Sequence, residues 1–110
     1  ENDHGLHGVE LKLTGFRAHG YMLSADHRLA RDMAAAHRAA HGTDPAAFAL
    51  ASTADARIYV EGFGVPAICY GAVAHGIHGV DESVDLRSIV DAARTLARFI
   101  YARFAEEGVV

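Results

Sequence analysis

The sequence predicts an α/β fold in which a partial mixed sheet is flanked by helices. Two amphipathic patterns with helical spacing, one starting near Ser24 and one at Asp85, alternate with short apolar segments that are typical of strands. A glycine-rich loop, residues 71–84, joins the last apolar segment to the second long helix. Strands that alternate with helices favour a parallel or mixed sheet covered by helices.

The first half of the chain is expected to contain a strand, a helix and a second short strand. Apolar and charged residues alternate over residues 9–13, which is the period of a half-exposed strand. Ser24 is the expected N-cap of the helix, and Gly42 is its expected C′ residue. Residues 46–51 are interpreted as a strand because polar residues follow them at once. The helix is expected to bury a narrow face made of Leu29, Met33, Ala36 and Ala40.

The second half is expected to contain a short helix, a strand and a long helix. The short helix opens within residues 53–57 and ends at Gly62 and Gly64, and residues 65–70 form the apolar strand. Acidic residues lie at the start of the long helix and arginines in its later turns, in agreement with the helix dipole. Its apolar positions recur with helical spacing at Leu86, Ile89, Val90, Ala93, Leu96, Ala97, Ile100 and Phe104.

Composition limits the possible partners and setting. The 110 residues fit one small domain, and 51% hydrophobic content favours a folded chain. A formal charge of −4 argues against a nucleic-acid or membrane-surface role. No run approaches the ~20 apolar residues of a membrane span, and no signal peptide is recognised. The single cysteine, Cys69, favours a reducing compartment such as the cytoplasm, where we expect a buried, inert thiol.

Two histidines on the first helix, His37 and His41, have the spacing at which imidazoles can share a metal ion. A zinc-protease motif would place a glutamate directly after the first histidine, and Arg38 stands there instead. An exposed, partly basic helix end is therefore the preferred interpretation of this pair. His4, His7 and His19 are expected to be solvated loop residues.

The loop carries the most promising chemistry of the sequence. In open α/β sheets ligands bind beyond the carboxyl ends of strands, and this loop follows the predicted strand 65–70. His78 is interpreted as a metal-binding imidazole at the rim of the sheet, with Asp81 and Glu82 close behind and His75 as a possible second imidazole. Catalytic zinc needs about three protein ligands, and this spacing alone does not make them converge.

Arg57, one turn into the short helix, is the candidate substrate-binding residue outside the loop. A guanidinium group matches the geometry of a carboxylate and can bind it through two hydrogen bonds. The alternative is an ion pair within the chain, with Asp55 or Glu61 as the partner.

The sequence over residues 24–108 resembles the carboxyl-terminal part of the zinc aminoacylase and deacylase superfamily. That superfamily includes acetylornithine deacetylase, succinyl-diaminopimelate desuccinylase, carboxypeptidase G and aminoacylase. Residues 78–84, His-Gly-Val-Asp-Glu-Ser-Val, are similar to its last metal-ligand motif. Residues 53–57, Thr-Ala-Asp-Ala-Arg, resemble a segment beside the substrate pocket. Residues 64–71 are similar to the strand that enters the active-site loop.

The resemblance implies roles for three residues. His78 would be a ligand to one of two zinc ions, and Thr53 and Arg57 would lie near the carboxylate end of the substrate. It assigns no catalytic residue to this chain, because the other ligands, the glutamate general base and the lid histidine lie upstream of the matching part. The loop departs from the family's Gly-Pro-Gly pattern, since residues 71–73 read Gly-Ala-Val.

The resemblance also implies a domain assignment. Residues 1–20 would form the end of a lid or dimerisation domain, and residues 21–110 the carboxyl-terminal part of a catalytic domain. The whole enzyme would be a cytoplasmic homodimer that cleaves the amide bond of an N-acyl amino acid or related amide. It would hold two zinc ions, with cobalt or manganese as alternative metals.

On this interpretation the chain is a fragment with empty metal sites and no activity of its own. Two other interpretations remain open at this point. One is a non-catalytic α/β binding or interaction domain, in which His78 is only a solvated loop residue. The other is a non-hydrolytic relative that keeps the scaffold without the metals.

Overall fold

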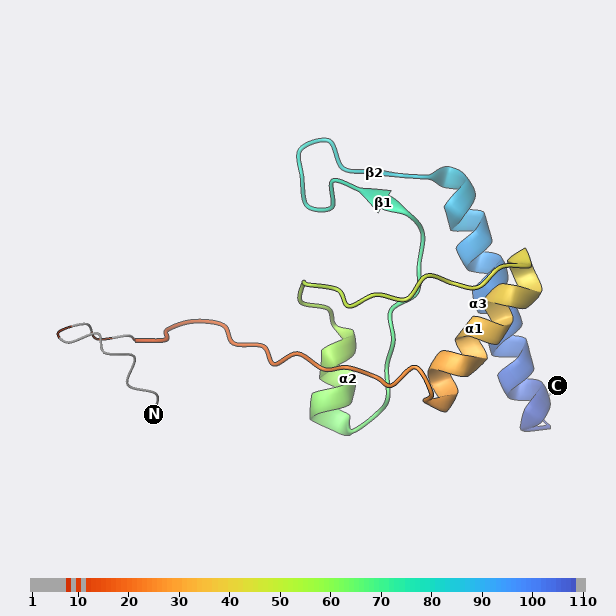
Figure 1. Ribbon diagram of the computed structural model, residues 1–110, viewed down its shortest axis with the longest axis horizontal. Helices are drawn as coiled ribbons and strands as arrows, with labels where there is room; N and C mark the ends of the chain where they lie inside the picture. Colours follow the sequence, from red (N-terminus) through yellow and green to blue (C-terminus); the bar gives the residue numbers. More distant parts are fainter. Residues whose placement is uncertain (1–7, 9, 11, 109–110) are drawn as a thin grey trace.

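The computed structural model of the chain describes residues 8, 10 and 12–108. These residues form three helices and one small sheet: α1 (Arg28–His41), α2 (Ala56–Phe63), β1 (Ala74–His75), β2 (Ser83–Val84) and α3 (Leu86–Glu106). Figure 1 shows α1 and α3 packed beside each other at one end of the molecule, with α2 on the other side of the segment that leads to β1. The described chain before α1 crosses α2 in this view and extends outward beyond it as an arm.

The predicted mixed sheet is not present in the described part of the chain. β1 and β2 form an antiparallel pair, with Ala74 opposite Val84 and His75 opposite Ser83. The predicted strands 46–51 and 65–70 have no strand partner, and without ladder hydrogen bonds an apolar segment does not become a strand. Of the predicted strand 9–13, residues 9 and 11 lie outside the described residues, and the other three form no strand.

The ends of α1 confirm one predicted cap and correct the other. Gly42 takes the left-handed conformation with φ 74° and donates its N–H to the Arg38 carbonyl, as expected of a residue that ends a helix. The N-cap is His27 rather than Ser24, because His27 Nδ1 accepts a hydrogen bond from the Leu29 N–H at 3.1 Å. Ser24 instead accepts from the Asp26 N–H and closes a turn just before the helix.

The other two helices agree with their sequence patterns. Asp85 caps α3 by accepting hydrogen bonds from the Arg87 and Ser88 N–H groups. The helix then continues to Glu106. α2 ends at Gly64, which has φ 64° and donates to the carbonyls of Tyr59 and Val60. Among the described residues, no helix combines the length and apolar character that a membrane crossing requires.

The best-packed part of the molecule is the contact between α1 and α3. Met33 and Ala36 of α1 are each 7% exposed, and Thr95 of α3 is fully buried. The residues of α3 that are buried or half-buried follow one face of the helix: Ser88, Asp91, Ala92, Thr95, Phe99 and Arg103. This face is largely polar. The side of α3 that packs on α1 is therefore opposite to the side that carries the regularly spaced apolar residues.

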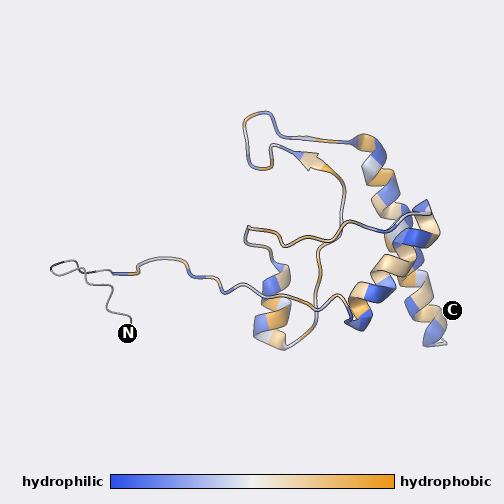
Figure 2. Cartoon of the chain, in the orientation of Figure 1, coloured by the Kyte–Doolittle hydropathy of each residue, from blue (hydrophilic) through white to orange (hydrophobic). Residues whose placement is uncertain are grey.

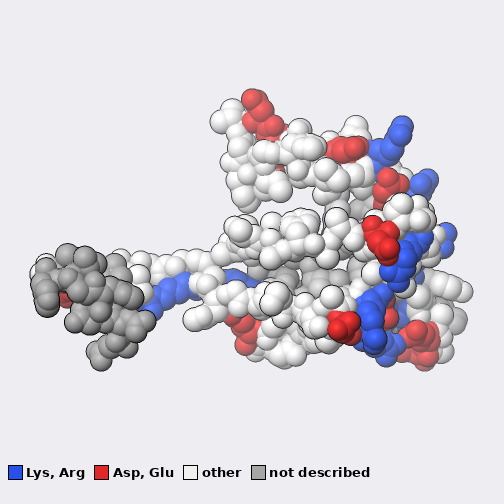
Figure 3. All heavy atoms as spheres, in the orientation of Figure 1, with Lys and Arg blue, Asp and Glu red and all other residues white. Residues whose placement is uncertain are grey.

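The apolar stripe of α3, defined by Leu86, Ile89, Val90, Leu96, Ile100 and Phe104, is therefore exposed. Leu86 is 74% exposed and Ile100 is 51% exposed, whereas such a stripe normally faces a core. Figure 2 shows further apolar residues along α2, and Figure 3 shows most charged side chains gathered over the α1–α3 pair. Cys69, expected to be buried in a strand, is exposed because no neighbouring strand covers its segment.

Candidate metal-ligand loop

The loop that carries His78 is the tip of a hairpin, residues 76–82, between β1 and β2. Gly76 has φ 60°, and the Gly79 N–H donates to the Gly76 carbonyl at 2.6 Å, which folds the tip into a tight turn. His78 has φ 65° and is the only non-glycine residue with a positive φ in the described part of the chain. Positive φ is uncommon for such residues, although histidine tolerates it better than most.

The base of the hairpin is fixed to the first turn of α3. Val73 accepts a hydrogen bond from the Asp85 N–H at 3.0 Å, and its own N–H donates to Ser88 Oγ at 2.9 Å. The Ser88 hydroxyl in turn donates to the Asp85 carbonyl at 2.6 Å. The position of the loop therefore follows the position of α3.

The side chains of the hairpin tip point to solvent, and all residues from 71 to 82 are exposed. An exposed imidazole is a suitable zinc donor, so His78 has the right chemistry for one ligand. His75, the possible second imidazole, lies on β1 opposite Ser83. Among residues 8, 10 and 12–108, no three His, Cys, Asp or Glu side chains come together to hold one ion. The described residues thus supply a candidate ligand but not a complete metal centre.

Thr53 and Arg57 lie around the start of α2, apart from the hairpin in the chain. Thr53 is exposed in the bend before α2, and Arg57 lies half-buried in the first turn of that helix. In Figure 1 this bend and the hairpin tip extend in the same direction from the α1–α3 pair. No hydrogen bond or ion pair among the described residues joins Thr53 or Arg57 to the hairpin tip.

Arg57 has partners within the chain. Its Nη1 lies 3.9 Å from Glu61 Oε2, and its Cζ lies 5.0 Å from the centre of the Phe16 ring. The expected alternative of an ion pair with Glu61 is therefore observed, and Asp55 does not take that role. At 3.9 Å the pair is at the long end of the range for an ion pair, so it leaves guanidinium donors available.

The pair His37 and His41 does not form the exposed helix end that the sequence favoured. Both rings are half-buried, and their centres lie 4.6 Å apart. His37 Nδ1 lies 2.8 Å from Tyr70 Oη, Tyr70 Oη lies 3.0 Å from Thr95 Oγ1, and His41 Nε2 lies 2.8 Å from the same Thr95 oxygen. These four side chains form a polar cluster that joins α1, α3 and the segment before the hairpin.

The cluster is satisfied by one arrangement of protons. The Thr95 hydroxyl donates to the Asp91 carbonyl, so its oxygen accepts from Tyr70 and from His41. Tyr70 then accepts from His37, which places a proton on Nδ1 of His37 and on Nε2 of His41. Sequence reasoning missed this cluster because its members are distant in the chain. The one available signal was a threonine in the middle of a long helix.

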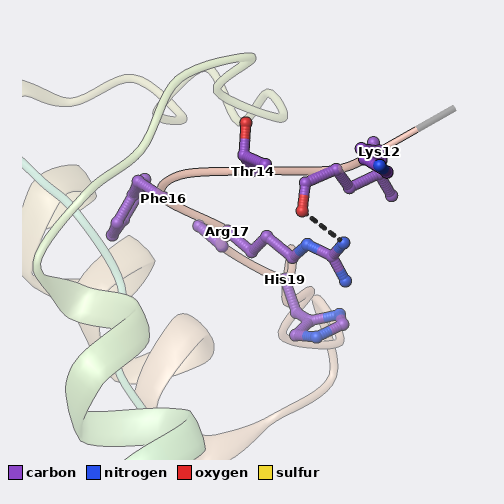
Figure 4. A pocket seen from close by; sticks show the side chains of 7 residues that line it. Lys12, Thr14, Phe16, Arg17 and His19 are labelled. Carbon is purple, nitrogen blue, oxygen red and sulfur yellow. Dashed lines mark hydrogen bonds between the residues drawn. The ribbon is translucent and has the colours of Figure 1, made fainter.

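A hollow in the arm has no relation to the hairpin. Figure 4 shows the side chains of Lys12, Thr14, Phe16, Arg17 and His19 around it, and the Arg17 guanidinium donates to the Leu13 carbonyl at 3.2 Å. The hollow is formed by one curled stretch of chain and contains none of the predicted site residues.

Replacing Gly79 with alanine should open the hairpin tip. A Cβ atom at this position would lie 2.8 Å from the Gly76 carbonyl oxygen, the atom that accepts the Gly79 N–H, so the turn must shift. We expect amide chemical-shift changes across residues 75–84 and a cost of about 1 kcal/mol in the free energy of unfolding. Gly71→Ala is the matched control, because its Cβ would meet nothing within 4 Å. Unchanged amide chemical shifts in Gly79→Ala would contradict the tight turn between Gly76 and Gly79.

Comparison with known proteins gives one match. The model of peptidase family M20/M25/M40 matches residues 5–102, which include α1, α2, the hairpin and most of α3. No curated protein and no solved structure matches the chain.

Proposed function

Because the chain belongs to peptidase family M20/M25/M40, we propose that it is part of a dinuclear zinc hydrolase that cleaves the amide bond of an N-acyl amino acid or related amide. Membership of this peptidase family supports a hydrolase. The zinc ions and the acyl substrate are the proposed detail, and they rest on the likeness of residues 53–57, 64–71 and 78–84 to the deacylase motifs.

The observation that supports this function best is the presentation of His78. Its imidazole stands exposed on a tight hairpin that is tied to a long helix, within the range that the family model matches. In the proposed enzyme His78 contributes one ligand, and the remaining ligands come from residues other than those described. The chemistry that zinc supplies when bound is to lower the pKa of water to about 7, so that it can attack an amide carbonyl.

Thr53 and Arg57 are proposed to bind the carboxylate end of the substrate. Arg57 stands in the first turn of α2, and its long ion pair to Glu61 leaves donors for a second carboxylate. The bend that carries Thr53 extends to the same side as the hairpin tip.

We further propose that residues 1–20 belong to a lid or dimerisation domain and residues 21–110 to the catalytic domain of a homodimer. The described part of the first stretch passes α2, where the centre of the Phe16 ring lies 5.0 Å from Arg57 Cζ, and then extends outward, as expected of a segment that joins two domains. The single cysteine favours the cytoplasm as the setting.

The experiment that tests this function has two parts. The reading frame upstream of Glu1 is expected to encode a His-x-Asp motif and a Glu-Glu pair, which would supply the other ligands and the general base. The protein encoded by the extended frame should hydrolyse N-acetyl amino acids after addition of zinc or cobalt, and the purified 110-residue chain should not. Turnover by the 110-residue chain alone would refute its role as an inactive part. An upstream frame without these motifs would favour a non-catalytic α/β binding domain.

A further inference from the structure

The segment that leads into the hairpin contacts α3 at two places. Tyr70 reaches Thr95 through its hydroxyl at 3.0 Å, and Val73 contacts Ser88 and Asp85 through its backbone at 2.9 and 3.0 Å. Thr95 and Ser88 are seven residues apart, so they lie on the same face of the helix, two turns from each other.

The lengths of the two elements match at these contacts. Seven residues of α-helix rise by about 10 Å. Three residues of extended chain, from Tyr70 to Val73, also span about 10 Å. A segment of this length reaches both attachment points with little slack, which leaves little freedom in where the hairpin begins.

The contact at Tyr70 is the more protected of the two. Thr95 is fully buried, and Tyr70 and the two histidines are half-buried, whereas the Val73 contacts lie at an exposed site. His37 of α1 also lies within hydrogen-bond distance of the Tyr70 hydroxyl, at 2.8 Å. The hydroxyl is thus held by α1 and by α3 at the same time.

We propose that Tyr70 is a positioning residue that holds the His78 hairpin on the helix pair through its hydroxyl contacts to Thr95 and His37. Its significance for catalysis rests on the proposed function, in which His78 is a metal ligand. Hydrogen bonds between Val73 and both Asp85 and Ser88 join the base of the hairpin to the start of α3, so the Tyr70 contact is the second point that fixes its approach.

Hydrogen exchange in the metal-free 110-residue chain tests this role. Tyr70→Phe removes only the hydroxyl, and we expect the Val73 and Asp85 amides to exchange roughly fivefold to tenfold faster, while the amides in the middle of α1 stay unchanged. Thr95→Val should also speed exchange at Val73 and Asp85, and, because Thr95 accepts from His41 as well, it should speed exchange at the end of α1. At Val73 and Asp85 the double variant should exchange like Thr95→Val alone. In Thr95→Ser, which keeps the hydroxyl, the Val73 and Asp85 amides should exchange at the rates of the parent chain.

Tyr101→Phe is the matched control, because Tyr101 is 68% exposed on α3 and makes no hydrogen bond among the described residues. Faster exchange over α1, α3 and the hairpin alike would show a general stabilising role, and it would overturn the proposal. Unchanged exchange at Val73 and Asp85 would overturn it as well.

The two proposals fail in different ways. The exchange measurement contains no metal, so its result does not depend on what His78 binds. If Tyr70→Phe loosens the hairpin while His78→Gly leaves zinc binding by the extended protein unchanged, the proposed function fails and the positioning role stands. If His78→Gly abolishes zinc binding but Tyr70→Phe leaves the exchange rates of the Val73 and Asp85 amides unchanged, only the positioning role fails.

Discussion

In the protein encoded by the extended frame, His78→Gly is expected to lower kcat/KM by on the order of 100-fold or more, because loss of a direct ligand exceeds the 10- to 100-fold effects of outer residues. Glycine is the informative replacement at this position. His78 has φ 65°, a conformation that glycine adopts without strain, so the hairpin keeps its shape while the imidazole is lost. The measurement is zinc content after dialysis together with the hydrolysis rate of an N-acetyl amino acid.

His75→Ala is the control for this change. His75 lies on the same hairpin, is also exposed, and pairs with Ser83 through its backbone, so its side chain can be removed without loss of the pairing. We expect its zinc content and rate to stay within about twofold of the parent, since surface substitutions cost little. Equal losses of zinc and of hydrolysis rate in the two variants would indicate that both changes act by disturbing the hairpin. The assignment of His78 as a zinc ligand would then be wrong.

A second large effect is expected from the exposed stripe of α3. An exposed apolar surface of this kind favours association, so the 110-residue chain should form oligomers at micromolar concentration. Ile100→Glu places a charge in the stripe while keeping a good helix former, and it should weaken association by roughly 10- to 100-fold, the value of one buried isoleucine side chain. Sedimentation velocity measures the monomer fraction across a dilution series.

Arg98→Gln provides the comparison for charge. It changes the net charge by the same amount as Ile100→Glu, from −4 to −5, but acts on the polar flank of the helix. Its sedimentation should match that of the parent chain. A parent chain that stays monomeric at high concentration would contradict the expected role of the stripe.

The helices could be predicted from the sequence because their signals are local. Asp85 before a run with helical spacing, and glycines at positions 42 and 64, define helix ends through contacts within a few residues. Ser24 shows the limit of this reasoning. His27 is also able to cap a helix through its ring nitrogen, and it lies three residues closer to the helix.

The sheet and the packing could not be predicted in the same way. Residues 46–51 and 65–70 have the composition of strands, but a strand also needs a neighbour to pair with, and the described chain provides none for them. The stripe of α3 predicts an amphipathic helix correctly, yet periodicity does not say which element covers it. The polar contact through Thr95 depends on three segments that meet only in the folded chain.

The local structure around His78 was predicted in part, and the roles of His78, Thr53 and Arg57 stay predictions. The sequence placed His78 in a glycine-rich turn ahead of a helix, and the structure has this arrangement. It did not indicate that the loop would be a hairpin closed by β1 and β2, because two-residue strands leave no periodic signal. The ion pair of Arg57 with Glu61 follows from their i, i+4 spacing, whereas the contact with Phe16 does not.

The matched lengths of α3 and residues 70–73 affect which sequence changes this region can accept. One residue inserted between Ser88 and Thr95 would turn the helix by about 100° and lengthen it by about 1.5 Å, so that the two attachment points would no longer share a face. Deletion of one residue within 70–73 would shorten the segment between the same two attachment points by about 3.3 Å. Homologous chains should therefore vary here by substitution, while insertions and deletions should occur at the hairpin tip or beyond Thr95.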